Sequence, residues 1–390
     1  MNRRIPLVLS LLILAAAAAP TAASAAAPAV LSPVAFDIAA APQPVRATDG
    51  KIHLAYEIRF DNQSNLEVDA VSIQARSRGR ALGARFAGPR LESVLRIDGG
   101  HKGLTIPPGG SGTVFMDVAY PPQAQSPRSL LHRLVLAGRP PGEPAATQTF
   151  AFTGVPTAVG HRAAIVVEPP LRGPGWVIGN GCCSPLNAHR GATLAINGSA
   201  HVPERFAIDF VQLNREDRLF SGPLALNTSY AYFGAPVHSA TAGTVVRVHD
   251  GLPEQTPGAL PAGATIQNAG GNYVVVAVGA GRYAFYAHLQ PGSIRVRKGE
   301  RLRPGQVVGL LGNTGNTDAP HLHFHIMDSP SPLEANGLPF TFTTLTGEGR
   351  ISQPGVLQTG AVVPIDRAAF TGRRHAQMPL GEQVVGFPLR

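Results

Sequence analysis

The sequence is poor in cysteine and in charged residues, and each shortage excludes a class of protein. Only two of the 390 residues are cysteines, and because Cys182 and Cys183 are adjacent they cannot staple a small disulfide scaffold. Charged residues make up 15%, and no long stretch combines Ala, Glu, Lys, Leu and Arg, which excludes a coiled coil. Hydrophobic residues still make up 44%, which excludes a wholly disordered chain.

Glycine and proline are present in excess. The 44 glycines and 36 prolines form about a fifth of the chain, against roughly 12% in ordinary proteins. Abundant turn residues with a near-normal apolar content predict short strands joined by many turns, and therefore an all-β fold. The net charge is +9, but the sequence has no Lys/Arg cluster or recognition motif for nucleic acid, so we expect no nucleic-acid partner.

Residues 1–25 have the pattern of a secretory signal peptide. Arg3 and Arg4 precede an apolar run, and the small residues 23–25 form a cleavage site. The apolar run is about 15 residues long, short of the roughly 20 that span a membrane. We therefore expect export to the periplasm, the extracellular space or the cell wall, with no integral membrane segment in the mature chain. After export, Cys182 and Cys183 could form a vicinal disulfide, stay buried thiols or pair between chains.

Two β-rich regions and a tail follow the leader. Residues 31–155 contain about seven strand-like segments, which predict an immunoglobulin-like sandwich acting as an accessory domain. Its clearest strand runs from Ile52 to Phe60, where apolar residues alternate with His53, Ala55, Glu57 and Arg59, the pattern of a half-buried strand. Residues 160–345 form the second β region, and residues 346–390 are a weakly patterned C-terminal extension expected over the surface.

The segment 320–326 concentrates the residues that carry chemistry. On a strand, positions two apart share a face, so His321, His323 and His325 project to the same side while apolar residues form the opposite row. Neutral imidazole is a common metal ligand, and such a row predicts metal binding or proton transfer. Asp209 lies inside an apolar strand, where a carboxylate is costly to bury unless it is paired or binds a metal.

These residues belong to a longer set of motifs. The segments of this set are Ala235-Pro236-Val237, Ala242-Gly243-Thr244-Val245-Val246, Gly271-Asn272-Tyr273-Val274, Tyr286-Ala287-His288-Leu289, Gly305-Gln306-Val307-Val308-Gly309, Gly312-Asn313-Thr314-Gly315 and Pro320-His321-Leu322-His323-Phe324. With these segments, the chain resembles the M23 family of zinc peptidases, also called LytM or lysostaphin-type endopeptidases, and Asp209 fits the family's upstream ligand motif.

The resemblance implies an M23-type β-sheet peptidase domain holding one Zn²⁺. It implies that Asp209 and His323 are zinc ligands and that His288 and His321 assist catalysis. The family's first ligand, a His four residues before the Asp, falls on Arg205. Arginine has no lone pair and stays protonated, so it cannot replace imidazole.

Another residue must therefore complete the metal shell if zinc binds. The candidates are His189, His325 and His201. We place His189 first because it lies in a loop, and loops adapt more easily than strands.

With a complete shell, the resemblance implies hydrolysis of peptide bonds in peptidoglycan cross-bridges. The alternative is a catalytically degenerate LytM-like domain that binds the cell wall or activates other cell-wall hydrolases. Arg205 favours this alternative, whereas Asp209, His288, His321 and His323 favour catalysis.

Overall fold

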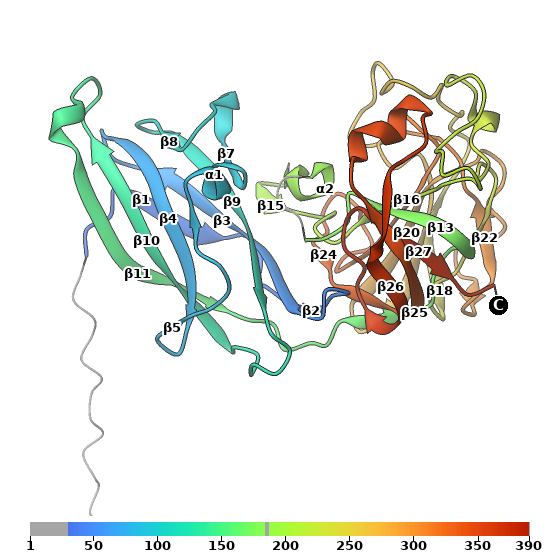
Figure 1. Ribbon diagram of the computed structural model, residues 1–390, viewed down its shortest axis with the longest axis horizontal. Helices are drawn as coiled ribbons and strands as arrows, with labels where there is room; N and C mark the ends of the chain where they lie inside the picture. Colours follow the sequence, from blue (N-terminus) through green and yellow to red (C-terminus); the bar gives the residue numbers. More distant parts are fainter. Residues whose placement is uncertain (1–29, 184–186, 390) are drawn as a thin grey trace, which may run out of the picture. The chain divides into compact units, whose positions relative to one another are not determined.

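The computed structural model describes residues 30–183 and 187–389, and most regular elements in them are strands (Figure 1). The all-β prediction is confirmed. The predicted signal peptide, residues 1–25, lies outside the described residues. Within those residues no helix is long and apolar enough to cross a membrane. The helical elements are short: α1 (Pro89–Glu92), α2 (Ala188–Gly191) and the 3-10 turns η1 (Asp98–Gly100), η2 (Pro144–Ala146), η3 (Asn227–Ser229) and η4 (Pro354–Thr359).

Two sheets form the N-terminal region, defined here as residues 34–158. One has the order β1-β3-β9-β7 with β2 on β3, and the other has the order β11-β10-β4-β5 with β6 and β8 on β4. Apolar side chains of both sheets share one core, so the sheets pack face to face. An immunoglobulin-like topology stays a prediction. The strands are β1 (Val34–Ile38), β2 (Pro44–Arg46), β3 (Ile52–Asn62), β4 (Glu67–Ser77), β5 (Arg80–Ala81), β6 (Phe86–Ala87), β7 (Leu95–Ile97), β8 (Thr105–Ile106), β9 (Ser111–Tyr120), β10 (Ser129–Arg139) and β11 (Gln148–Ala158).

Strand β3 differs from its predicted half-buried state. His53, Ala55 and Glu57 form the row expected to face solvent, yet each is at most 5% exposed. The physical reason is that residues from Ser32 onward form one compact unit, in which this row is covered by later parts of the chain. Polar alternation on β3 therefore indicates an internal contact rather than a solvated face.

A twelve-stranded sheet organises the C-terminal region, defined here as residues 165–387. Its order is β12-β25-β27-β13-β16-β23-β20-β19-β18-β21, with β24 on β23 and β26 on β25. Two small sheets accompany it, β14 with β15 and β17 with β22. The first strands are β12 (Ile165–Val167), β13 (Gly173–Gly179), β14 (Leu194–Ile196), β15 (Ser199–His201), β16 (Ile208–Gln212), β17 (Pro236–His238), β18 (Gly243–His249), β19 (Asn272–Gly279), β20 (Arg282–Leu289), β21 (Arg301–Leu302), β22 (Val307–Leu310) and β23 (Leu322–Met327).

The C-terminal segment joins this sheet instead of lying over its surface. Strands β24 (Gly337–Leu338), β25 (Phe340–Ile351), β26 (Ile365–Gln377) and β27 (Gln383–Phe387) follow the strand that carries the His row. All five residues of β27 are buried, and this strand lies between β25 and β13. Strand β27 thus completes the sheet beside β13.

Candidate metal centre

Pairing among β16, β23 and β20 gathers four of the predicted site residues. Asp209 on β16 lies opposite His323 on β23, and Ala287 on β20 lies opposite His323 on the other side. His288 follows Ala287, and His321 directly precedes β23. The rings of His288 and His321 have centroids 4.4 Å apart.

Packing of the opposite face fixes this orientation. Leu322, Phe324 and Ile326 are fully buried in the core of the C-terminal region, as their alternation with the histidines predicts. The apolar row of β23 therefore turns His323 toward Asp209.

His189 reaches the same place from a different segment. It lies on α2, where the Asn187 side chain accepts a hydrogen bond from the Arg190 amide at 2.8 Å and caps the helix. The His189 Nδ1 atom is 3.1 Å from the carbonyl oxygens of both Asn180 and Ala207. Because carbonyls only accept, Nδ1 carries the proton and Nε2 faces Asp209 Oδ2 at 3.1 Å.

His189, Asp209 and His323 present ligand atoms that lie within 4.8 Å of one another. The second contact in this group joins His323 Nδ1 to Asp209 Oδ1 at 3.0 Å. Two imidazoles and one carboxylate match the three-ligand set of catalytic zinc sites, which leave a position open for substrate. The backbone bonds of His189 Nδ1 also fit the outer hydrogen bonds typical of metal-binding histidines. The residues present therefore fit a zinc ion.

The other two candidates for the third ligand lie elsewhere. His325 Nδ1 is 2.8 Å from His323 Nε2, so His325 lies behind His323 as its hydrogen-bond partner. His201 lies on β15 and is not in the group of possible ligands that contains Asp209. Of the three histidines named from the sequence, the structure brings only His189 to Asp209.

Charges inside the group are strongly coupled. Burial opposes ionisation of Asp209, but His189 and His321 hold the pKa of this carboxyl well below its usual range. Burial likewise disfavours a charged His189, yet the charge and hydrogen bond of Asp209 raise the pKa of this histidine to about 9. The site thus keeps a carboxylate ready for a cation.

His288 is held in one orientation as a neutral imidazole. Burial, together with the charges of His321 and His323, lowers its pKa well below the ordinary value. Its Nδ1 donates to the Thr314 carbonyl at 2.7 Å, which leaves Nε2 as the acceptor. Its φ of 61° is an unusual value for a non-glycine residue, and such residues cluster at functional sites.

The loop behind His288 depends on close backbone contact. Gly271 has a φ of +61°, and a Cβ at this position would collide with the Thr314 carbonyl that His288 contacts. Glycine at 271 is therefore required for the loop that orients His288.

A cavity of about 330 Å³ opens onto the site. Asn180, which the sequence analysis did not single out, lines it and donates through Nδ2 to Asp209 Oδ2 at 2.8 Å. The only signal available in the sequence is the Asn180-Gly181 turn dipeptide, which says nothing about a contact 29 residues away. The cavity is lined by Asn180, Ala188, His189, Glu204, Asp209, Leu260, Ala269, Gly270, Phe285, Ala287, His288, Asn316, Thr317, Asp318, His321 and His323.

Arg205, which lies four residues before Asp209, is not among the residues that line this cavity. Its Nε and Nη2 atoms bond the carboxylate of Glu57 on β3 at 2.9 and 2.6 Å. Glu57 thereby compensates the positive charge of Arg205.

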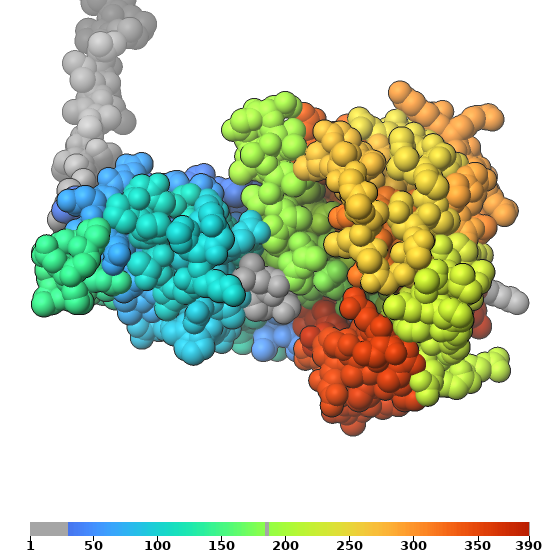
Figure 2. All heavy atoms as spheres, turned by 90° about the horizontal axis from the view of Figure 1, so that it is seen from above, coloured from blue at the N-terminus to red at the C-terminus, as the bar shows by residue number. Residues whose placement is uncertain are grey.

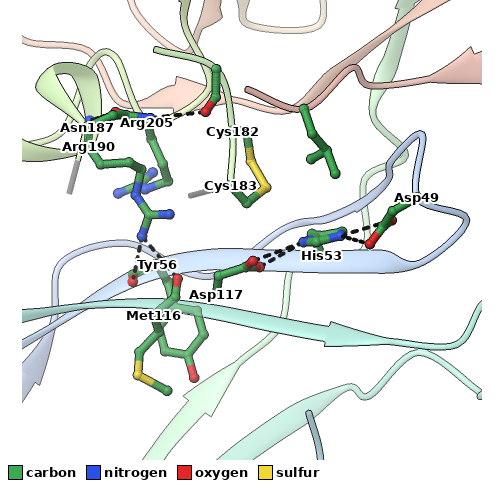
Figure 3. Close-up of a disulfide and its surroundings, with 12 residues drawn as sticks. Asp49, His53, Tyr56, Met116, Asp117, Cys182, Cys183, Asn187, Arg190 and Arg205 are labelled. Carbon is green, nitrogen blue, oxygen red and sulfur yellow. Dashed lines mark hydrogen bonds and ion pairs between the residues drawn. A yellow bond between two sulfur atoms is a disulfide. The ribbon is translucent and has the colours of Figure 1, made fainter. Parts of the chain in front are cut away.

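The two cysteines form a disulfide with each other. Both are buried, in the segment between β13 and α2, and they belong to one hydrophobic cluster with Val45 and Ala55 of the N-terminal region. Figure 3 shows the pair beside Asp117 and His53. Of the three states expected for Cys182 and Cys183, the structure has the vicinal disulfide.

Comparison with known proteins identifies part of the chain. The model of peptidase family M23 matches residues 228–335. These residues form an M23 peptidase domain. Of the site residues, His288, His321 and His323 lie within the M23 match, whereas His189 and Asp209 precede it.

Relatives of the M23 domain include two proteins of Vibrio cholerae. Peptidoglycan DD-endopeptidase ShyA is 42% identical over 65 residues, 17% of this chain and 15% of that protein. Peptidoglycan DD-endopeptidase ShyB is 33% identical over 102 residues, 26% of this chain and 20% of that protein. The chain thus matches only about a fifth or less of these relatives. The solved catalytic domain of lysostaphin from Staphylococcus simulans is 24% identical, with coverage of 42% of this chain and 88% of that one and a TM-score of 0.24.

Proposed function

We propose that this protein is an exported zinc metalloendopeptidase that hydrolyses peptide bonds in the cross-bridges of peptidoglycan. The observation that carries the proposal is the convergence of His189, Asp209 and His323 beside His288 and His321 in one cavity. The M23 match and the relatives named peptidoglycan DD-endopeptidases support the reaction and the substrate class.

The chain supplies a group for proton transfer and a group that can stabilise the developing oxyanion. Zinc held by the three ligands would polarise the scissile carbonyl as a Lewis acid. His288 keeps a lone pair on Nε2, so it can take a proton from the attacking water and return that proton to the leaving amine. His321 donates through Nδ1 to the Ala319 carbonyl at 2.9 Å, so that its Nε2, when protonated, can stabilise the developing oxyanion.

The surroundings suit an extended, slender peptide. A second cavity, of about 360 Å³, shares Asn180, Asp209 and His321 with the first, so open space lies on more than one side of the carboxylate. The net charge of +9, lowered by two when the predicted signal peptide leaves, favours association with anionic wall polymers. This electrostatic attraction weakens with salt.

Digestion of isolated peptidoglycan tests the proposal. Purified mature protein with one equivalent of zinc should release muropeptides with new amino and carboxyl ends, detected by mass spectrometry. His321→Ala should abolish the release, whereas His375→Ala, a change at an exposed position on β26, should not. A protein that binds both zinc and peptidoglycan but releases nothing would refute an enzyme and support the alternative, a wall-binding or hydrolase-activating module.

A further inference from the structure

Glu57 is an acidic residue of the N-terminal region with no access to water. It lies on β3 in the row that faces away from the core shared by the two N-terminal sheets, and it is 1% exposed. A buried carboxylate is costly unless charges and hydrogen bonds compensate it. Among the described residues, ion pairs to this carboxylate come from Arg190 on α2 and from Arg205 shortly before β16.

Two arginines surround this carboxylate. Arg205 binds it through Nε and Nη2, and Arg190 Nη2 lies 3.6 Å from its Oε1 atom. Arg190 is completely buried and also donates to the carbonyl oxygen of Met116 at 3.0 Å (Figure 3). In Figure 2 the green segment that includes α2 lies against the blue and teal N-terminal region. Glu57, Arg190 and Arg205 are called the charge triad below.

Each arginine of the charge triad lies close in sequence to a residue that could bind the metal. Arg190 directly follows His189 on the four-residue helix α2. Arg205 lies two residues before Ala207, whose carbonyl accepts a hydrogen bond from His189 Nδ1, and four residues before Asp209. One carboxylate from the N-terminal region therefore fixes both segments that meet at the site.

We propose that Glu57 is a positioning residue of the metal centre: through Arg190 and Arg205 it holds α2 where His189 can act as the third ligand. This inference rests on the proposed zinc site and extends it, because it makes the N-terminal region a structural part of that site.

Zinc affinity, measured by competition with a chromophoric chelator on the mature full chain, tests this role without relying on activity. Glu57→Gln should weaken zinc binding at least tenfold, the lower end of the effect of outer-shell changes. Glu67→Gln is the matched control, because Glu67 pairs with Arg139 on the other N-terminal sheet. The zinc affinity of Glu67→Gln should stay within twofold of the wild-type value.

A double-mutant cycle separates positioning from general loosening of the fold. If Glu57 acts through His189, Glu57→Gln should change zinc affinity less than twofold when His189→Ala is already present. An equal loss in both backgrounds, or no loss in the wild-type background, would overturn the proposal. Folding of each variant is checked by circular dichroism.

If Glu57→Gln does not fold, the zinc affinity of Arg190→Met tests the positioning role instead. It leaves the Glu57–Arg205 ion pair intact, so the remaining buried charges still balance. It should again weaken zinc binding at least tenfold, and unchanged affinity would overturn the positioning role. A wild-type chain that binds no zinc would instead refute the proposed function, which distinguishes the two failures.

Discussion

The charge triad makes a quantitative prediction about stability. Glu57→Gln leaves two buried guanidinium groups, those of Arg190 and Arg205, without their carboxylate. Removing one partner from a buried ion pair costs about 3–5 kcal/mol, because the other charge stays buried. At about 2–4 °C per kcal/mol for domains of 150–250 residues, the unfolding midpoint should fall by roughly 6–20 °C.

The single tryptophan provides the assay. Trp176 lies on β13 in the C-terminal region and is 1% exposed, so its fluorescence reports unfolding of the sheet that carries the site. Glu57→Gln should therefore lower the midpoint of the unfolding transition that Trp176 reports, even though Glu57 lies in the N-terminal region. Arg205→Met should lower the free energy of unfolding less than Glu57→Gln does, because Arg190 remains beside Glu57.

Glu67→Gln serves as the reference for this experiment. Its partner Arg139 is partly exposed, and such pairs contribute about 0–1 kcal/mol. An equal shift of the Trp176 transition for Glu57→Gln and Glu67→Gln would mean that the charge triad contributes no more to stability than a surface ion pair, contrary to this prediction.

Two further predictions concern groups around the site. Asn180→Ala removes the amide that bonds Asp209, so zinc affinity by chelator competition should fall about 10–100-fold, and an unchanged affinity would contradict this. Burial raises the pKa of Glu254 to about 7, so the folded chain loses stability as pH rises from 4.5 to 7. Glu254→Gln should then match the wild type in urea unfolding at pH 4.5 and exceed it by about 1 kcal/mol at pH 8, a figure discounted for partial exposure; a constant difference would refute this.

Local patterns in the sequence were enough to predict the strands of the site. Alternation on β23 separates the buried row Leu322, Phe324 and Ile326 from the histidines, and the spacing of two places His321 and His323 on one side. These features depend on neighbours in sequence, so the sequence alone carries them.

Contacts between distant segments could not be predicted in the same way. The sequence pattern predicts that Glu57 on β3 faces solvent, but in the structure this residue is buried. Alternation shows which residues share a face of a strand, but it does not show what covers that face. His189 was one of three candidates, because the sequence does not show which loop meets Asp209. The weakly patterned segment of β27 gave no sign that it completes the sheet, since a buried strand is specified by its neighbours rather than by alternation.

The most direct test of the account is the zinc affinity of the His189→Ala chain, with the wild type and His201→Ala measured beside it. We predict one zinc per wild-type chain, a loss of affinity greater than about a hundredfold in His189→Ala, and a value within twofold of the wild type in His201→Ala. Wild-type affinity in His189→Ala would contradict the metal centre described here.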